Sequence, residues 1–152
     1  MHRLVVAVIF AATAVAVAAR PVHAQTTQPT ADTTAAVQGA QAAGEAWLAL
    51  LMEGKGKETW AETSKHFQAA VPEAAWVQQV AALRTQLGTF EGRTLDQAEY
   101  ATDVPNAPPG EYVALIYKSE FANLESAREV LSLTFEDGHW KVVGYFVQPA
   151  GD

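Results

Sequence analysis

Residues 126–149, SAREVLSLTFEDGHWKVVGYFVQP, decide the fold that we expect of this chain. The dipeptide Asp137-Gly138 separates two runs in which apolar and polar residues alternate. Both central residues of a type I′ turn need positive φ, and Asp-Gly is one of the pairs that accept it best. The stretch therefore predicts a β-hairpin, and its two-residue turn fixes the register by placing Glu136 opposite His139.

Counting away from the turn gives the hairpin two different faces. On one face we expect the pairs Phe135–Trp140, Leu133–Val142 and Leu131–Gly144, and on the other Thr134–Lys141, Ser132–Val143 and Val130–Tyr145. The first face is apolar and needs a cover, whereas the second is mixed. A glycine in mid-strand, such as Gly144, marks a bulge, a bend or a close approach of another segment, and we favour a bend.

Three helical segments precede any strand. Apolar and small residues recur at spacings of three and four over residues 35–52, 57–67 and 72–87. Gly54 and Gly56 follow the first segment and Gly88 follows the third, as expected of left-handed C-terminal caps. Pro72 suits the first position of the third helix.

Beyond Gly88 the pattern is that of strands. Residues 90–102 predict an edge strand, residues 104–110 a stiff proline-containing loop, and residues 111–121 a strand with Val113, Leu115, Tyr117 and Phe121 on one face. Helices followed by consecutive strands indicate an α+β domain. We expect three N-terminal helices packed on a curved four-stranded antiparallel sheet, in one domain that covers residues 35–149.

The N-terminal end has the pattern of an export signal. His2-Arg3 give a positive start, residues 4–19 form an apolar run without charge, and Val22-His23-Ala24 resemble a cleavage site. We predict a signal peptide over residues 1–24, cleaved after Ala24, and a disordered linker over residues 25–34, which are rich in Thr, Gln and Pro. The alternative is an uncleaved anchor, but residues 4–19 are short against the roughly 20 residues that a spanning helix needs.

Charge and cysteine content exclude several classes of function. Without Arg3 and Arg20 the chain keeps 8 of its 10 basic residues against 17 acidic ones, a net charge of −9. That charge argues against nucleic acid or an anionic membrane surface as the main partner. The chain contains no cysteine, so it has neither disulfides nor a lipid anchor through Cys. We expect a periplasmic or secreted protein that depends on its core for stability.

Short sequence pieces in a fixed order carry a family resemblance across residues 46–147. They are Trp47-Leu48-Ala49-Leu50, residues 60–67, Trp76 with Arg84, Leu87-Gly88, Arg93-Thr94, residues 108–113, Glu129-Val130 and residues 137–145. In these pieces the chain resembles an exported bacterial family known as domain of unknown function 4019. The resemblance implies a small periplasmic α+β domain and brings no activity with it.

The pattern Gly-x-Trp-Lys-Val at residues 138–142 is also similar to the last hairpin of nuclear-transport-factor-2-like folds. Those folds are cones of helices closed by a bent sheet. They host enzymes, binders and scaffolds alike, so the analogy implies a shape and leaves the function open.

The aromatic residues provide the first hypothesis for a site. A concave pocket between helices and sheet for a small apolar or amphipathic ligand would be lined by Trp47, Trp60, Phe67, Trp76, Arg84, Phe135 and Trp140. The alternative, which we favour for the aromatic residues, is a plain hydrophobic core. Arg84 borders an apolar stripe, where a charge needs a partner. It would pair with a carboxylate such as Glu58 or Glu120, which we favour, or meet an anionic ligand.

The second hypothesis is a protein-interaction surface for a partner in the cell envelope. It would use the outer sheet face around Tyr112, Val143 and Tyr145. The sequence leaves the ligand, the partner and the oligomeric state open, a dimer included.

Catalysis and metal binding have little support in the sequence. His66 and His139 lie far apart, and no serine lies in a glycine-flanked elbow, so we expect no metal site, no cofactor and no nucleophilic catalysis. An isomerase- or dehydratase-like enzyme would need a carboxylate beside a phenol in an apolar cone, as in ketosteroid isomerase. The candidates for those roles are Asp96, Glu99, Tyr100, Asp103, Tyr112 and Tyr145, and we favour a solvated position for most of them. We therefore expect a binding protein that is not an enzyme.

Overall fold

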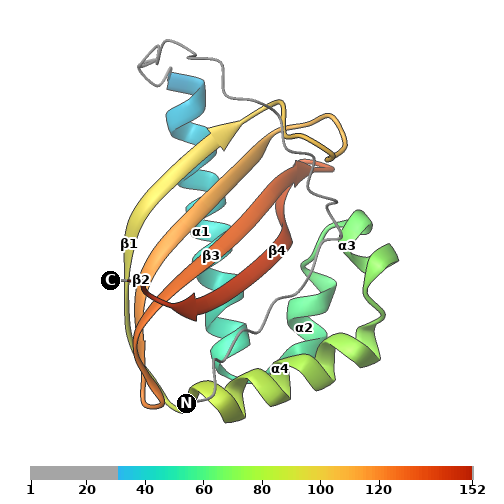
Figure 1. Cartoon of the computed structure of the whole chain (residues 1–152). Coiled ribbons are helices and arrows are strands. Elements are labelled where there is room, and N and C mark those ends of the chain that lie inside the picture. The colour runs from blue at the N-terminus through green and yellow to red at the C-terminus, as the bar shows by residue number, and fades with distance from the viewer. Residues whose placement is uncertain (1–30, 152) are drawn as a thin grey trace, which may run out of the picture.

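The computed structural model describes residues 31–151 of the chain, as four helices followed by four strands (Figure 1). The helices are α1 (Ala31–Met52), α2 (Gly56–Ala61), α3 (Lys65–Ala70) and α4 (Glu73–Leu87), and the strands are β1 (Phe90–Ala101), β2 (Tyr112–Phe121), β3 (Leu124–Glu136) and β4 (His139–Pro149). The expected signal peptide, its cleavage site and residues 25–30 of the expected linker lie outside the described residues. Residues 31–34 belong to α1 and not to a linker, and Asp32 in the first turn complements the helix dipole.

The four strands form one antiparallel sheet in the order β1-β2-β3-β4, so each strand pairs with its neighbour in sequence. The expected α+β class and the four-stranded antiparallel sheet are confirmed. The two-residue turn is confirmed as well: Asp137 has φ 51° and Gly138 has φ 82°, and Glu136 pairs with His139. The positive φ of both residues is the reason that Asp-Gly occurs here.

The register that we derived from the turn holds for four pairs and then changes. Phe135 pairs with Trp140 and Leu133 with Val142, but the next pair is Ser132 with Gly144. Val143 is the extra residue of a β-bulge, and beyond it every β4 side chain points to the face opposite to the one we predicted. The predicted pairs Leu131–Gly144, Ser132–Val143 and Val130–Tyr145 are therefore wrong, and Tyr145 lies opposite Leu131.

The predicted helix over residues 57–67 is in fact two short helices, α2 and α3, separated by an extended connection. Thr63 in this connection forms a parallel bridge with Val142 of β4. The backbone N–H of Ser64 donates to the Val142 carbonyl at 2.8 Å, and the Val142 N–H donates to the Glu62 carbonyl at 3.2 Å. The Ser64 hydroxyl caps α3 by accepting from the Phe67 N–H at 3.1 Å. Pairing with the free edge of β4 thus outweighs the continuation of the helix.

The helix ends follow the sequence more closely. Gly54 (φ 76°) follows α1 and Gly88 (φ 75°) follows α4, and both have the positive φ that was expected, although Gly88, with ψ −157°, lies outside the left-handed helical region. Gly56 does not cap α1, because it is the first residue of α2. Pro72 precedes the first turn of α4 as its N-cap, one position earlier than we expected.

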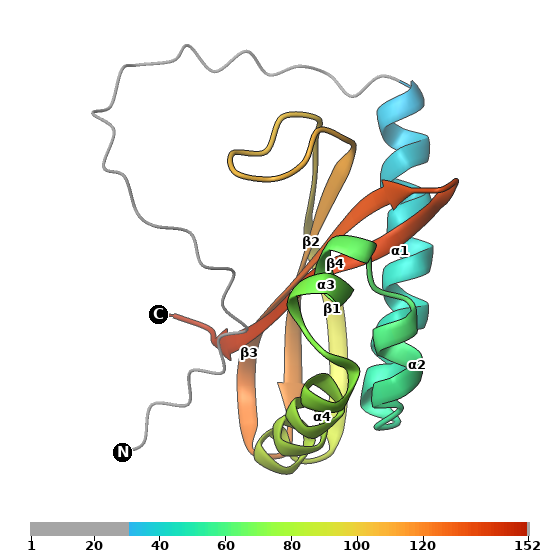
Figure 2. The same ribbon diagram turned by 90° about the vertical axis from the view of Figure 1, so that its right-hand side faces the viewer.

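The core lies between the sheet and the helices. In Figure 2 the twisted sheet is seen nearly edge-on, with α1 along one face and α4 across its end. We call the face toward α1 the inner face and the opposite one the outer face. At Gly44, α1 approaches the inner face so closely that a β-carbon would lie 2.9 Å from Leu115 Cδ1 and 3.0 Å from Leu131 Cδ2.

Candidate functional site

The most strongly polar feature of the inner face is the buried carboxylate of Glu129, on β3. Arg93 of β1 donates to it twice, from Nε to Oε2 at 2.6 Å and from Nη2 to Oε1 at 2.9 Å. The hydroxyl of Ser119, on β2, donates to Oε2, and the hydroxyl of Tyr145, on β4, donates to Oε1. We call these four residues the Glu129 cluster. Each of the four strands contributes one member of it.

The cluster is saturated with hydrogen bonds. A carboxylate offers about four lone-pair positions, and the four donors of the cluster occupy them. A charged pair whose remaining polar atoms are also satisfied can persist inside a core. Glu129 is 0% exposed, and it has no lone pair left with which to take a proton from a ligand. The geometry therefore fits a structural role, in which the Glu129 carboxylate joins the four strands, better than the role of a catalytic base.

Two buried phenols lie here, that of Tyr145, which is a member of the cluster, and that of Tyr117. Burial, followed by the negative charge of Glu129 and the hydrogen bond to it, raises the pKa of Tyr145 well above its ordinary value. Burial raises the pKa of Tyr117 to about 12. Within the described residues the Tyr117 hydroxyl has no hydrogen-bond partner. Both phenols therefore stay neutral at physiological pH.

The seven residues of the predicted ligand pocket do not lie together. Trp47, Phe67 and Trp76 are 1–3% exposed and pack in the core, with ring centroids 6.0 Å apart for Trp47 and Trp76 and 5.3 Å apart for Phe67 and Trp76. Phe135 and Trp140 form a separate pair at the tip of the hairpin, with their centroids 5.3 Å apart.

The indole N–H groups of the helical tryptophans explain part of this packing. Trp47 donates to the Thr59 carbonyl at 2.9 Å, and Trp76 donates to the Thr59 hydroxyl at 3.0 Å. Trp60 donates to the Val71 carbonyl at 2.8 Å. Each indole thus has a partner inside the protein, which is the usual arrangement for a tryptophan that belongs to a core.

Arg84 does not form the expected ion pair. It is exposed, and its guanidinium lies beside Gly54, where an added β-carbon would be only 2.4 Å from Nη1. Among the ion pairs of residues 31–151, none joins Arg84 to Glu58 or Glu120. The buried ion pair of the fold is instead the one between Arg93 and Glu129.

The predicted partner surface is split by the bulge at Val143. Tyr112 and Val143 lie at the outer face, as expected. Tyr145 is 4% exposed and points into the core, so its predicted place on the outer face is wrong. The cause is the extra residue in β4, which reverses the direction of the side chains that follow it.

The carboxylates considered for acid–base chemistry lie at the surface. Asp96, Glu99 and Asp103 are exposed, and Asp96 pairs with Lys118 at 2.6 Å. Tyr100, half-buried, donates to Glu111 at 2.8 Å, and this hydrogen bond raises its pKa. None of these carboxylates faces a buried phenol in an apolar cavity. The buried carboxylate beside a phenol is Glu129, which was not among the candidates that we drew from the sequence.

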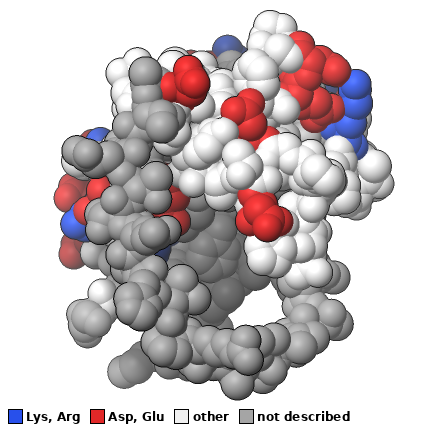
Figure 3. All heavy atoms as spheres, turned by 90° about the horizontal axis from the view of Figure 1, so that it is seen from above, with Lys and Arg blue, Asp and Glu red and all other residues white. Residues whose placement is uncertain are grey.

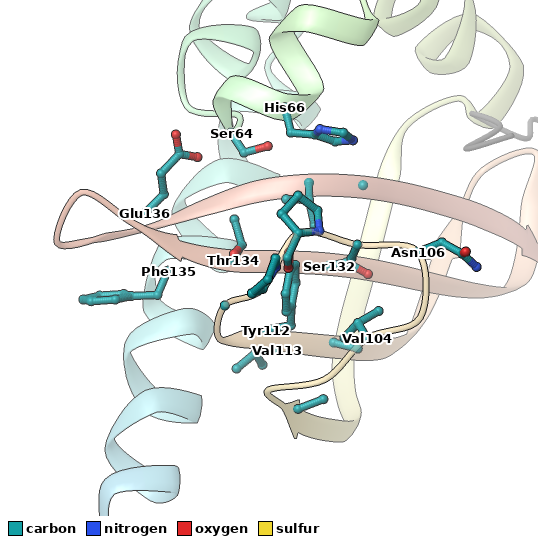
Figure 4. Close-up of a pocket in the computed structure, with 18 of the residues that line it drawn as sticks. Ser64, His66, Val104, Asn106, Tyr112, Val113, Ser132, Thr134, Phe135 and Glu136 are labelled. Carbon is teal, nitrogen blue, oxygen red and sulfur yellow. The ribbon is translucent and has the colours of Figure 1, made fainter. Parts of the chain in front are cut away.

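A hollow of about 680 Å³ lies on the outer face of the sheet, under the loop between β1 and β2. Its floor is formed by residues of the four strands, one wall by residues 104–110, and another by residues 64–66 at the start of α3. Figure 4 shows Ser64 and His66 on one side of the hollow, Asn106 on another, and Ser132 and Thr134 between them. We call this site the outer hollow.

Several hydrogen bonds hold the walls of the outer hollow in place. The Tyr112 hydroxyl donates to the Pro108 carbonyl at 2.6 Å, and the Thr134 hydroxyl donates to the Glu111 carbonyl at 3.0 Å. On the opposite wall, the backbone N–H of Lys65 donates to Glu136 Oε2 at 3.2 Å. The loop and the start of α3 are thereby both tied to the hairpin, so the hollow is formed before any ligand enters it.

The surroundings of the outer hollow are acidic. Figure 3 looks onto the end of the molecule that carries the 104–110 loop and the hairpin tip, and acidic side chains there outnumber basic ones on the visible surface. Lys65 extends to Asp137, with Nζ 2.6 Å from Oδ2, and this hydrogen bond raises the pKa of Lys65 and lowers that of Asp137.

Neither a metal site nor a membrane span is found in the part of the chain that the structure describes. No group of three or more His, Asp or Glu side chains within residues 31–151 is arranged to hold a metal ion. No helix in the same range is both long and apolar enough to cross a membrane.

Comparison with curated proteins gives no match. Comparison with family models gives one over residues 43–145, which is more than half of the chain and includes all four strands up to Tyr145. The chain therefore belongs to the family described as protein of unknown function (DUF4019).

Proposed function

We propose that this protein is exported to the periplasm and there binds a small amphipathic ligand in the outer hollow, without catalysing a reaction. The observation that carries the proposal is the hollow itself. Its volume of about 680 Å³ falls within the range of roughly 300–1,000 Å³ that is typical of small-ligand sites. Export rests on the sequence pattern of residues 1–24.

The composition of the outer hollow supports an amphipathic ligand. Proline and valine side chains of the loop, the Tyr112 ring and Val143 offer apolar surface. Ser132 and Asn106 offer polar groups for which the structure gives no partner among the described residues. Such a mixture of apolar walls and a few polar groups is typical of a site that orients one end of its ligand.

A binding role is also better supported than catalysis. Of the carboxylates that line the outer hollow, Glu99 is exposed, and the half-buried Glu136 accepts from the Lys65 backbone N–H; the buried Glu129 has its lone pairs occupied by Arg93, Ser119 and Tyr145. A general base needs a lone pair within hydrogen-bond reach of its substrate. We further propose kinship with nuclear-transport-factor-2-like folds, which is supported by the bent sheet with α1 along one face.

The alternative function is that of a protein-interaction module. It is supported by Phe135, which is 44% exposed at the rim of the outer hollow, and by Tyr112 and Val143 within it. A partner peptide that laid one apolar side chain into the hollow would use the same residues.

Native mass spectrometry of the protein released from the periplasm tests both export and binding. We expect the mass of a chain that begins at Gln25. We also expect a bound adduct of a few hundred daltons, which dissociates from the protein on collisional activation. The variant Ser132→Trp fills the floor of the hollow and should lose the adduct. Thr94→Trp, at an exposed position of the same sheet face outside the hollow, should keep it. An adduct that survives Ser132→Trp would place binding elsewhere. Retention of residues 1–24 in a membrane fraction would contradict cleavage after Ala24, and recovery of the protein from the cytoplasm would contradict export.

A further inference from the structure

The charged side chains of the outer hollow are unevenly compensated. Lys65, Glu99 and Glu136 line it, together with His66. The Lys65 ammonium is held by Asp137 at 2.6 Å and lies 3.9 Å from Glu136, whose carboxylate also accepts from the Lys65 backbone N–H. Among the described residues Glu99 has neither a hydrogen bond nor an ion pair. The uncompensated charge of the hollow is therefore negative, and it is supplied by β1.

An aromatic side chain, that of Tyr112, adds to this preference. Because the Tyr112 hydroxyl is fixed on the Pro108 carbonyl, its ring forms part of the wall of the hollow. The face of an aromatic ring carries negative electrostatic potential and attracts cations that approach within about 6 Å of the centroid.

The overall charge of the chain acts in the same direction. Residues 25–152 contain 8 basic and 17 acidic side chains, a net charge of −9. A field of this sign raises the local concentration of cations and lowers that of anions near the surface.

We propose that the ligand class of the outer hollow is an amphipathic cation, a molecule with one ammonium-like group and an apolar body. The cationic group lies against Glu99, and the apolar body lies along the loop prolines, Val143 and the Tyr112 ring. This inference rests on the proposed function, because it names the chemistry of the ligand that the outer hollow takes.

Three probes that share one apolar chain separate the charge preference from binding itself. They are octylammonium, octan-1-ol and octanoate, each titrated into the isotope-labelled chain from residue 25 to residue 152, with the amide signals of Asn106, Ala107 and Gly110 as the readout. We expect octylammonium to bind tightest and octanoate weakest. Glu99→Gln should weaken the binding of octylammonium by roughly fivefold, since a partly exposed charge pair contributes up to about that factor to affinity. The affinity for octan-1-ol should stay unchanged.

Two further variants serve as controls. Glu91→Gln removes a charge from an exposed position of the same strand outside the hollow and should leave all three affinities unchanged. Ser132→Trp should abolish binding of all three probes. Ala101→Trp fills the hollow from β1 and replaces Ser132→Trp if the latter does not fold.

The possible outcomes separate the two proposals. Equal or tighter binding of octanoate or octan-1-ol, together with loss of all binding in Ser132→Trp, would overturn the cation preference and leave the binding role intact. No binding of any probe, or binding that survives both filling variants, would overturn the binding role as well. If the protein formed a dimer and the amide signals of Asn106, Ala107 and Gly110 changed with dimer formation, the occupant of the outer hollow would be a second copy of the chain. That result would also overturn the proposal.

Discussion

Arg93 and Glu129 are joined by two parallel hydrogen bonds, although the strands that carry them are not neighbours in the sheet. Arg93 lies on β1 and Glu129 on β3, with β2 between them. The guanidinium therefore passes over Ser119 of β2, whose hydroxyl donates to the same carboxylate. The Glu129 side chain is 0% exposed and that of Arg93 is 12% exposed. This contact holds the edge strand β1 to the centre of the sheet.

Replacing Glu129 by Gln should destabilise the protein by about 3 kcal/mol, because it leaves the guanidinium of Arg93 buried without its counter-charge. Urea unfolding followed by tryptophan fluorescence gives the free energy of unfolding. The matched control is Glu125→Gln on the same strand, where the side chain is exposed and a change within about 0.5 kcal/mol is expected.

The double variant Arg93→Met with Glu129→Leu completes this test. Removing both charges together leaves no unpaired ion, so the double variant should be more stable than Glu129→Gln alone. If Glu129→Gln were as stable as the wild type, the ion pair between Arg93 and Glu129 would not contribute to the stability of the fold.

Deleting Val143 should be tolerated, because it removes the residue of β4 that has no partner on β3. The bulge places Val142 and Tyr145, three positions apart, on the same face of the sheet; without Val143 they stand two positions apart and still both face the core, opposite Leu133 and Leu131. We expect the deletion to lower the melting temperature by no more than a few degrees. A fall of about 10 °C or more would show that the fold needs Val143 for more than the reversal of side-chain direction.

The two buried tyrosines should respond in opposite ways to loss of their hydroxyl groups. Tyr145→Phe removes a donor to Glu129 and should cost about 1–2 kcal/mol. Tyr117→Phe removes a hydroxyl that has no partner among the described residues and should be neutral or stabilising at pH 7. Urea unfolding of the two variants side by side measures the difference, and equal losses would contradict it.

Stability should fall steeply at alkaline pH. The pKa of Tyr117 is about 12 in the folded protein against 10 in the unfolded chain, so the unfolded state loses its proton first. The stabilisation is complete below pH 10 and is lost as the pH rises toward 12, by up to about 3 kcal/mol for this group. Tyr145 acts in the same direction. Tyr117→Phe should lose less stability than the wild type over this interval, as measured by urea unfolding at each pH.

Gly56→Ala should destabilise the contact between α2 and α4. A β-carbon at this position would lie 3.0 Å from the Cα of Val77, and backbone atoms cannot move aside as the end of a side chain can. We expect a loss of about 1–2 kcal/mol in the free energy of unfolding. Gly92→Ala, with no heavy atom within 4 Å of the added carbon, is the control and should be close to neutral.

The local elements of this fold could be predicted from the sequence because their signals are local. Asp137-Gly138 determined the turn and the four pairs next to it, and Gly88 determined the end of α4. The division between α2 and α3 could not be predicted in this way. It depends on the hydrogen bonds that Val142 forms with Ser64 and Glu62, residues far from it in sequence, and helical periodicity over residues 57–67 does not reveal them.

The polar centre of the fold has a signal in the sequence, in the alternation of the residues of β2 and β3. Ser119 stands at the same alternating position as Val113, Leu115 and Tyr117, and Glu129 at the same position as Leu131 and Leu133. A charged residue at an inward position of a strand needs a buried partner, so the alternation would have indicated Glu129. The outer hollow had no such signal, because its depth depends on the path of the 104–110 loop in space.

The strand order β1-β2-β3-β4 also bears on how the chain reaches this structure. Each pairing joins segments that follow one another directly, so every hairpin can form by closing a short loop at low entropic cost. The bridge between Thr63 and Val142, by contrast, requires a closure over most of the domain. We infer that the hairpins form early and that the α2–α3 connection docks onto β4 late, as expected of chains in which local contacts form before distant ones. The connection that borders the outer hollow would then also be among the first parts to detach when the folded protein fluctuates.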